Sequence, residues 1–325
     1  MNRLERETEA YRAWLEERRT AICSTDSPKI LGLSRWGSPR SVYYDKVDPL
    51  PEVLPESSLS AWLGRSLEDT VARRFTHETG LSVRRSNRFY RLRDMHWIGG
   101  HIDFFISNKR AILECKTRGD RRGWGGDESD VIPPDVWVQV QHEMLITGTK
   151  WATVACLFGL RTFGIFYVNR DDEFLRMLKD RMATFWHEHV LAGAPPDPIY
   201  SDAALLADQY PQDDGVIRSA TPATDELILR YRDAQKRRIE AEKEEDTAKA
   251  RIKDIIGTAS GITGLHGTVT WKADRPNALI QHDEYAAELE LMALELGVEP
   301  EKINTIKESH TYTRDPQRVF LFKEG

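Results

Sequence analysis

The chain has 325 residues, of which 40% are hydrophobic and 30% are charged, and its formal net charge is −6. This length allows one large or two modest domains, and the composition is that of an ordinary globular protein. The net charge argues against a protein that coats DNA generically, the longest apolar stretch is too short to cross a bilayer, and we expect no signal peptide. Because Cys23, Cys115 and Cys156 are too far apart for a disulfide framework or a metal-binding pair, we expect a cytoplasmic location.

Basic and acidic residues are unevenly distributed along the chain. Residues 1–125 contain 23 Lys and Arg against 17 Asp and Glu, whereas residues 126–325 contain 23 against 35. The basic first part suits a local binding surface for phosphate groups. Because the excess is small, a chance feature of the exposed surface is the alternative.

The first predicted helix covers residues 4–19 and leads into the segment WLEERRTAICSTD. Arg18 in this segment can grip a phosphate with both arms of its guanidinium group. The alternative is a solvated helix end, because Arg18 lies in the charged run EERR.

A short helix, SPKILGL, is predicted next, with Thr25 and Asp26 as candidates for its N-cap. The loop that follows is rich in proline and glycine. Arg35 and Arg40 in this loop are candidate DNA contacts.

Residues 59–79, LSAWLGRSLEDTVARRFTHET, are predicted to form an amphipathic helix that ends at Gly80. Its apolar residues recur at helical spacing, at Leu59, Trp62, Leu63, Leu67, Val71 and Phe75. From the residues alone, Glu68 on this helix is expected to form a surface ion pair with Arg65 or Arg73.

Residues 81–98 are predicted to form a pair of strands. From residue 84 to residue 122 the chain has 11 basic and 4 acidic residues, interleaved with aromatic residues. This pattern suits a surface that follows a phosphate backbone. Asp94 lies in the predicted turn.

Residues 99–117, GGHIDFFISNKRAILECKT, are predicted to form a buried hairpin, because apolar residues occupy both faces. If Asn108 and Lys109 are the central turn residues, Asp103 lies directly opposite Glu114, with Cβ atoms roughly 5 Å apart. A residue two positions further along a strand points to the same face. The hairpin therefore presents a basic residue, Lys116, beside the two acids.

Two carboxylates this close repel each other unless a cation lies between them. Mg²⁺ binds one or two protein carboxylates and leaves its other positions to water and substrate phosphate. A lysine alongside can hold a water nucleophile or offset charge on the phosphate, so Asp103, Glu114 and Lys116 suit metal-assisted phosphodiester hydrolysis. The alternative is a surface hairpin in which Glu114 pairs with Lys116.

The segment after Lys116, TRGDRRGWGGDESDVIPP, lacks the GK[ST] of a P-loop. We expect a mobile loop at the mouth of the site. Arg118, Arg121 and Arg122 could hold the DNA backbone there, and Trp124 could stack, although a solvated loop is the alternative for each.

Residues 134–147, PDVWVQVQHEMLIT, are predicted to form a buried helix, on which Gln139 and Gln141 are polar candidates or ordinary solvated positions. The apolar runs at 151–160 and 162–169 are expected as outer strands of the core sheet. A further helix is predicted over 171–192, with a weak metal pattern, HEH, at 187–189.

The rest of the chain is predicted to be a separate, acidic part. Residues 193–223 are rich in Pro, Asp, Ala and Ser, which is typical of a linker or a wrapping arm. A long charged helix over 225–256, capped by Thr224, precedes a strand TVTWK, a helix over 283–296 and a final run RVFLF. We therefore predict a domain over 1–200, a linker over 201–224 and an accessory module over 225–325.

Taken together and in this order, the motifs resemble the PD-(D/E)XK nuclease superfamily and, more narrowly, the phage lambda exonuclease and YqaJ-type viral recombinase family. The resemblance covers about residues 10–190 and rests on the W-x(3)-R segment, the GRSLED helix, the D-x(10)-E-C-K hairpin and the QVQHEM helix. It implies an α/β restriction-endonuclease-like core, with a mixed central sheet flanked by helices, plus a C-terminal helical and small β module. Ile102, where the superfamily name implies proline, is a departure.

The resemblance also implies roles for individual residues. The metal ligands are Asp103, Glu114 and the backbone carbonyl of Cys115, and Arg18 binds the 5′-phosphate. The catalytic set comprises Asp103, Glu114, Lys116, Glu68 and Gln141, with Asp94 and Gln139 as possible members. Further DNA contacts are Thr25, Arg35, Arg118 and Arg121.

The activity that the resemblance implies is a Mg²⁺-dependent exonuclease, with Mn²⁺ as substitute, that digests duplex DNA from 5′ to 3′ and leaves 3′ overhangs. It also implies phage-type recombination in a bacterial host cell, a homotrimer around the duplex and a single-strand annealing protein as partner. Alternatives are another endonuclease of the superfamily, a RecB-like repair nuclease or a non-catalytic module that binds DNA ends. RecB-like members with an iron–sulfur centre need four well-placed cysteines, and this chain has three.

Overall fold

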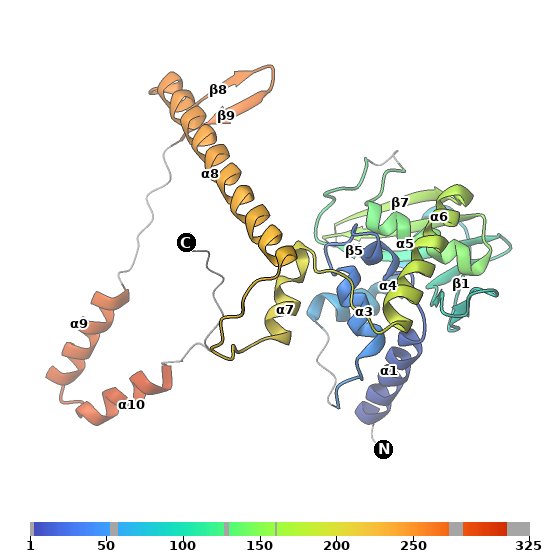
Figure 1. Cartoon of the computed structure of the whole chain (residues 1–325), viewed down its shortest axis with the longest axis horizontal. Helices are drawn as coiled ribbons and strands as arrows, with labels where there is room; N and C mark the ends of the chain where they lie inside the picture. The colour runs from blue at the N-terminus through green and yellow to red at the C-terminus, as the bar shows by residue number, and fades with distance from the viewer. Residues whose placement is uncertain (1–2, 53–57, 127–129, 160, 273–281, 311–325) are drawn as a thin grey trace. The chain divides into compact units, whose positions relative to one another are not determined.

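The computed structural model describes residues 3–52, 58–126, 130–159, 161–272 and 282–310. The chain divides into two units, Met1–Gln209 and Tyr210–Gly325, which are described separately (Figure 1). The division falls inside the predicted linker. The assignment of nuclease function to residues 1–200 and of an accessory role to residues 225–325 stays a prediction.

A five-stranded mixed sheet forms the centre of the first unit, with helices on both faces (Figure 1). Across the sheet the order is β1 (Val83–Arg85), β4 (Phe104–Ile106), β5 (Ala111–Arg118), β6 (Trp151–Phe158) and β7 (Thr162–Asn169). Strands β5 and β6 run parallel, and the other adjacent strands of this sheet are antiparallel. The predicted mixed central sheet flanked by helices is confirmed.

Helix α5 (Pro134–Thr147) connects β5 to β6, because parallel neighbours need a crossover connection. Proline opens the helix, where its missing N–H costs nothing, and Gly148 ends it with a φ of 68°. Strand β6 lies between β5 and β7, so the predicted outer position is right for β7 and wrong for β6.

The two faces of β5 meet different helices. Leu113 packs in a cluster with the apolar face of α4 (Leu59–Thr79), whereas Ile112 belongs to the larger core that includes α5. Successive side chains of a strand point to opposite faces. Glu114 and Lys116 share the face of Ile112, so α5 covers them.

Three helices precede α4: α1 (Arg3–Arg19), α2 (Ser27–Ile30) and α3 (Pro39–Val47). Asp26 is the N-cap residue of α2 as predicted, but its side chain makes no capping hydrogen bond. The Asp26 carboxylate instead accepts a hydrogen bond from the Cys23 backbone N–H at 2.9 Å and pairs with Lys46 at 2.8 Å.

The predicted strand pair over residues 81–98 is only partly right. Strand β1 joins the central sheet beside β4, and β2 (Tyr90–Arg91) pairs with β3 (Gly99–Gly100) in a separate two-stranded sheet. Glycine permits this second pairing, because a Cβ atom on Gly99 would lie 2.5 Å from the Phe89 ring and 2.7 Å from the Tyr90 carbonyl oxygen.

The first unit ends with helical segments that follow β7. They are α6 (Asp172–Phe185), a π-helix (Trp186–Leu191), a 3₁₀ turn (Tyr200–Asp202) and α7 (Ala203–Gln209). The HEH pattern lies in the π-helix, where His189 bonds the carbonyl oxygen of Ala194 at 2.9 Å and His187 packs against Trp97. Over the described ranges, these histidines join no group of side chains that could hold a metal ion.

The second unit contains α8 (Pro222–Ile256), the hairpin of β8 (Gly261–Gly264) and β9 (Gly267–Thr270), α9 (His282–Glu295) and α10 (Pro300–His310). The cap of α8 is Thr221 rather than the predicted Thr224, and its hydroxyl accepts from the Thr224 N–H. The predicted run RVFLF lies outside the described residues. In the parts of the chain that the structure describes, no helix is both long enough and apolar enough to cross a membrane.

Candidate active site

The hairpin of β4 and β5 has the predicted register, but its turn differs. The Lys109 N–H donates to the Ile106 carbonyl oxygen at 3.2 Å, so Ser107 and Asn108 are the central turn residues rather than Asn108 and Lys109. Asn108 has a φ of 58°, a conformation that asparagine tolerates better than most residues, and Phe104 pairs with Leu113. Continued by one position, this register sets Asp103 opposite Glu114. The sequence spacing alone therefore determined which two carboxylates meet.

Glu114 and Lys116 form a buried ion pair, with 2.6 Å between the Glu114 Oε1 and the Lys116 Nζ. Only 6% of the Glu114 side chain and 14% of the Lys116 side chain are exposed to solvent. Although burial disfavours the charged form, Glu114 and Asp103 together raise the pKa of Lys116. The lysine is therefore a fixed positive charge at neutral pH.

Gln139 on α5 completes this pair. Its amide oxygen accepts a hydrogen bond from Lys116 at 2.8 Å, and its amide nitrogen donates to Glu114 Oε1 at 2.7 Å. One amide thus binds both members of the ion pair. Gln139 was only a possible site residue in the sequence, and the structure sets it beside the predicted charges.

Asp103 lies just before β4, and its Oδ2 accepts a hydrogen bond from the Cys115 backbone N–H at 2.9 Å. Burial, reinforced by the charges of Glu114 and Glu68, raises the pKa of Asp103 well above its usual range. The carboxyl group therefore favours either a proton or a nearby cation.

Glu143 is a third acid beside the pair, and the sequence analysis missed it. It is 1% exposed, and its Oε1 accepts a hydrogen bond from the Gln139 amide nitrogen at 2.9 Å. Within the described residues its Oε2 has no hydrogen-bond partner. Burial and the charges of Glu114 and Asp103 raise the pKa of Glu143 well above its usual range. The signal was present in the sequence, because Gln139 and Glu143 are four residues apart and so share one face of a helix.

Glu68 approaches the site from α4. The Arg85 guanidinium group holds Glu68 Oε2 at 3.0 Å, so the partner is neither of the arginines considered from the sequence. Burial raises the pKa of Glu68, Arg85 opposes the rise, and Glu114 adds to it. Because the charge of Glu114 acts on Glu68, we place Glu68 at the edge of the cluster of acids that surrounds Glu114.

Gln141 does not lie at this site, and the expectation that it does is wrong. Its amide nitrogen donates to the Asn169 carbonyl oxygen at 2.7 Å, and its amide oxygen accepts from the Asp171 N–H at 3.0 Å. Residues two apart on a helix point in widely different directions, so Gln139 and Gln141 cannot serve the same site. Gln141 instead joins α5 to the connection between β7 and α6.

The structure places the remaining predicted site residues and DNA contacts in different surroundings. Asp94 is exposed in the turn between β2 and β3, and among the described residues no contact joins it to Asp103 or Glu114. Arg121 packs its guanidinium group over Phe158 and donates to the Gly125 carbonyl oxygen at 2.9 Å, so it supports its own loop.

Trp124, expected to stack on DNA, is instead buried. Its ring packs against those of Phe158 and Phe166, and 8% of the residue is exposed. Arg35 and Arg118, in contrast, line a common cavity beside β5.

Arg18 is half-buried rather than solvated. Its Nη2 donates to the Thr25 hydroxyl at 2.8 Å, and its guanidinium group lies 4.7 Å from the centre of the Trp14 ring. Behind it, the buried pair of Asp26 and Lys46 is anchored by a hydrogen bond from Lys46 to the Arg18 carbonyl oxygen at 3.2 Å. Arg18 and Thr25, both predicted phosphate contacts, therefore lie side by side, and a buried ion pair supports them from behind.

His101 connects this arginine site to the hairpin. Its Nε2 lies 3.5 Å from a carboxylate oxygen of Glu17, and its ring packs against Trp14. Glu17 is next to Arg18, and His101 is two residues before Asp103. The end of α1 is therefore held at a set position relative to the carboxylate pair.

The residues present fit a hard divalent cation. Asp103, Glu114 and the Cys115 carbonyl offer oxygen, the ligand that Mg²⁺ prefers, and the unpartnered oxygen of Glu143 lies in the same buried group. Across the described ranges, no group of three or more acidic, histidine or cysteine side chains is arranged to hold a metal ion by itself. Mg²⁺ is compatible with this arrangement, because it usually keeps several waters and takes only one or two carboxylates.

Comparisons with known proteins find a family model and a relative that are similar to this chain. Residues 13–150 match the model of the YqaJ-like viral recombinase domain. The uncharacterized protein YqaJ of Bacillus subtilis is 35% identical over 201 residues, which cover 61% of this chain and 61% of that protein.

Two solved structures are also similar. The alkaline exonuclease of Laribacter hongkongensis has a TM-score of 0.44 at 15% identity and matches 56% of this chain and 94% of its own. The phage related exonuclease of Haemophilus somnus 129PT has a TM-score of 0.40 at 13% identity and matches 58% and 96%.

Proposed function

We propose that this chain is a divalent-metal-dependent exonuclease acting on duplex DNA, since its residues 13–150 match the model of the YqaJ-like viral recombinase domain. It digests one strand from 5′ to 3′ and leaves 3′ single-stranded overhangs, as an enzyme of phage-type recombination does. The observation that carries the proposal is the buried group in which Asp103 lies opposite Glu114 and beside Lys116.

Two features of this group support hydrolysis of a phosphodiester. Asp103, Glu114 and the Cys115 carbonyl would hold a Mg²⁺ or Mn²⁺ ion, which would supply charge stabilisation and lower the pKa of a water molecule. Lys116 is held by Glu114 and Gln139 at 2.6 and 2.8 Å, so its positive charge is in place before the substrate arrives. Such preorganised charge is worth most in a buried site, where no reorganisation is needed during the reaction.

Gln139 and Glu68 support these groups. The Gln139 amide orients Lys116 relative to Glu114, and Glu68 adds negative charge that favours a cation over an empty site. Gln139 takes the position in this proposal that the sequence analysis gave to Gln141.

End recognition is assigned to Arg18 and Thr25. A terminal phosphate carries one more negative charge than an internal one, and the Arg18 fork can bind it through two parallel hydrogen bonds. The contacts of His101 with Trp14 and Glu17 hold this site at a set distance from Asp103. A fixed spacing between a phosphate site and a hydrolytic site is what gives an exonuclease its polarity.

The same proposal includes assembly. A ring of three copies around the duplex and a single-strand annealing protein as partner follow from the resemblance to the lambda exonuclease family. Measurement of the molecular mass in solution tests the ring, and mixing with candidate annealing proteins tests the partner.

The experiment that tests the activity uses linear and circular duplex DNA of the same sequence, with and without Mg²⁺. We expect the linear form alone to be digested, and only with the metal. Cleavage of the circular form would instead indicate an endonuclease of the superfamily. Binding to DNA ends without digestion in Mg²⁺ or Mn²⁺ would indicate a non-catalytic module.

A further inference from the structure

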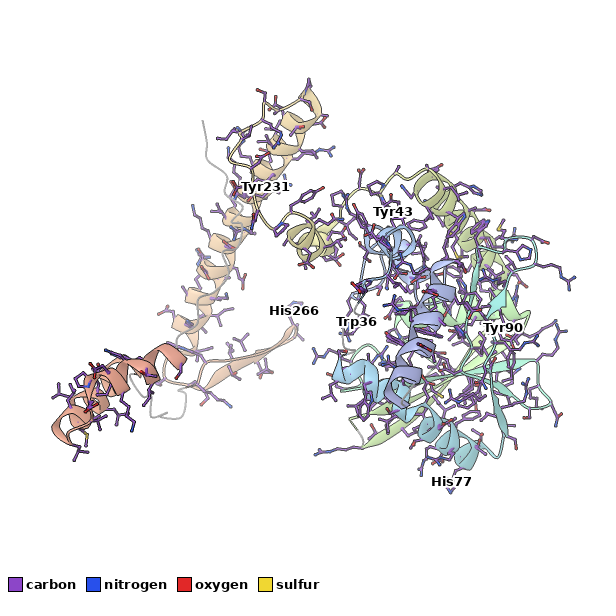
Figure 2. All side chains as sticks on the ribbon, turned by 90° about the horizontal axis from the view of Figure 1, so that it is seen from below. Trp36, Tyr43, His77, Tyr90, Tyr231 and His266 are labelled. Atoms are coloured by element: carbon purple, nitrogen blue, oxygen red, sulfur yellow. The ribbon has the colours of Figure 1, made fainter. Side chains whose placement is uncertain are left out.

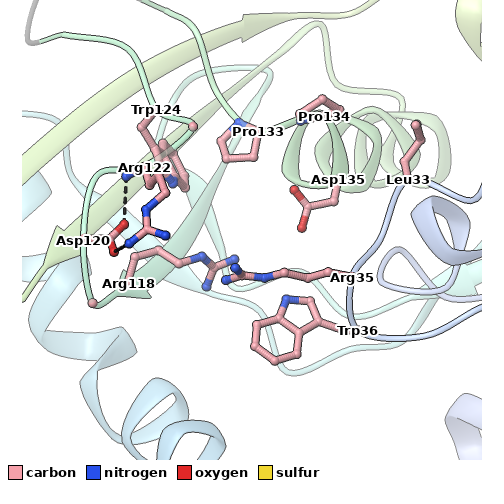
Figure 3. A pocket seen from close by; sticks show the side chains of 12 residues that line it. Leu33, Arg35, Trp36, Arg118, Asp120, Arg122, Trp124, Pro133, Pro134 and Asp135 are labelled. Carbon is pink, nitrogen blue, oxygen red and sulfur yellow. Dashed lines mark hydrogen bonds and ion pairs between the residues drawn. The ribbon is translucent and has the colours of Figure 1, made fainter. Parts of the chain in front are cut away.

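A cavity of about 570 Å³ lies beside the candidate active site, between the end of β5 and the start of α5 (Figure 3). This volume is in the range of about 300–1,000 Å³ that small-ligand pockets have. Its wall combines three arginines, Arg35, Arg118 and Arg122, with two tryptophans, the exposed Trp36 and the buried Trp124. The acids on the wall are Asp120 and Asp135.

The cavity lies next to the candidate active site on the same strand and the same helix. Arg118 follows Lys116 by two residues on β5, so the two point to the same face, roughly 6–7 Å apart along the strand. Asp135 precedes Gln139 by four residues on α5 and shares its helix face. A substrate strand bound at Lys116 and Gln139 therefore reaches this cavity with its adjoining nucleotide.

The charges in the cavity suit an anion. Arg35 and Arg118 extend toward each other across the cavity, next to the Trp36 ring (Figure 3). Among the described residues no carboxylate forms an ion pair with either of them. Asp120 is already occupied, because it pairs with Arg122 at 3.0 Å. Two facing guanidinium groups repel each other, and a phosphate between them removes that repulsion.

Trp36 supplies a stacking surface beside these charges. It is 67% exposed and stands at the outside of the first unit (Figure 2). The Arg35 guanidinium group lies 4.6 Å from the centre of the ring, which orders the indole while most of its surface stays in solvent. Large exposed aromatic rings next to arginines are typical of proteins that bind single-stranded nucleic acid.

We propose that this cavity binds one nucleotide of single-stranded DNA, with its base stacked on Trp36 and its phosphate between Arg35 and Arg118. The statement that this nucleotide adjoins the cleaved bond rests on the function proposed above. Binding of single-stranded DNA by the cavity does not rest on that function, because such binding needs neither the carboxylates nor a metal. The two proposals can therefore fail separately.

The test measures binding of a fluorescently labelled oligothymidylate to the full chain by anisotropy, in EDTA so that nothing is hydrolysed. We expect Trp36→Ala to weaken binding roughly 5- to 100-fold, the range found for loss of one stacked base. Trp36→Phe keeps a ring and should lose much less. Because Trp36 is exposed, we expect an unchanged thermal midpoint for both variants, which separates lost binding from lost folding.

A second probe isolates the base. An oligonucleotide of the same length made of abasic units keeps the phosphates but offers nothing to stack. We expect the wild-type chain to bind it more weakly than oligothymidylate, and Trp36→Ala to bind the two probes about equally. If Trp36→Ala binds oligothymidylate as the wild type does, or if the abasic strand binds the wild type equally well, the proposal is wrong.

The phosphate contacts are tested by salt dependence. Each lost phosphate contact should lower the slope of log K against log salt by about 0.7 for a single strand. We therefore expect a smaller slope for Arg35→Ala and for Arg118→Ala, and no change for the matched control Arg176→Ala on the exposed face of α6. Equal slopes for all three variants would overturn the assignment of the phosphate.

Discussion

Gln139 accepts a hydrogen bond from Lys116 at 2.8 Å, and this contact determines which way the Gln139 amide is turned. Since the oxygen faces the ammonium group, the nitrogen must face acids, and it donates to both Glu114 and Glu143. The orientation of one neutral side chain therefore depends on three ionisable ones.

Gln139→Ala should lower the rate of hydrolysis roughly ten- to hundredfold. The variant loses one hydrogen bond to Lys116 and one to Glu114, each worth about 1.5–3 kcal/mol. Lys116 and Glu114 recover much of this energy by binding each other more closely. The matched control is Gln141→Ala, two residues away. It removes two hydrogen bonds to the backbone and should lower the free energy of unfolding by about 1–3 kcal/mol, with little loss of hydrolysis in the folded protein. Rates from linear duplex and urea unfolding of both variants test this, and the reverse pattern would restore Gln141 to the site.

Asp103→Asn should abolish hydrolysis while leaving affinity for DNA ends within a fewfold of the wild-type value. The carboxylate serves the cation, whereas phosphate contacts are assigned to arginines. Digestion of linear duplex and binding in EDTA measure the two properties separately. Near-normal digestion by this variant would contradict the metal assignment.

Glu143→Gln should make the metal-free protein more stable at neutral pH. The pKa of Glu143 is raised by burial and by Glu114, so the folded state binds this proton more tightly than the unfolded chain, whose carboxyl pKa is about 4. The stabilisation that this group contributes is full below about pH 4 and is lost as the pH rises through the folded pKa. Glutamine does not titrate, so the variant does not lose stability in this way as the pH rises.

Thermal midpoints in EDTA from pH 4 to pH 8 check this prediction. The midpoint of Glu143→Gln should exceed that of the wild type at pH 8, and the difference should shrink toward pH 4. Asp180→Asn, an exposed acid on α6, is the control and should show no such trend. A lower midpoint for Glu143→Gln at pH 8 would mean that the carboxylate stabilises the fold through Lys116.

Arg18→Ala should slow digestion of 5′-phosphorylated duplex about ten- to a hundredfold, the effect of one charge-assisted hydrogen bond of roughly 1.5–3 kcal/mol. Duplex with a 5′-hydroxyl should be slowed much less, and Arg18→Lys should recover only part of the rate, because lysine lacks the planar fork. Arg19→Ala is the matched control. Equal slowing on both ends would show that Arg18 only stabilises the end of α1.

A chain that ends at Gln209 should still fold and digest linear duplex. Every residue that the proposal assigns to the site belongs to the unit Met1–Gln209. Solubility, circular dichroism and the digestion assay measure the outcome, with altered assembly as the expected difference. An insoluble fragment would show that the second unit is needed for folding of the first.

The sequence by itself determined the parts of this site that depend on local spacing. A strand has a period of two and a hairpin turn fixes its register, so Asn108 at the turn was enough to bring Asp103 opposite Glu114 and Lys116 to the same face. The amphipathic period of residues 59–79 and the glycine after it likewise predicted α4 and its end. Such features are decided within twenty residues of chain.

The tertiary structure decided which helix face meets the hairpin. Helix α5 is buried on nearly all sides, polar positions included, so the sequence could not tell Gln139 from Gln141, or show that Glu143 joins the group. The crossover of α5 over the parallel pair β5 and β6 settles the rotation of the helix. The partner of Glu68 and the cavity at Trp36 depend in the same way on segments that meet only in the folded chain.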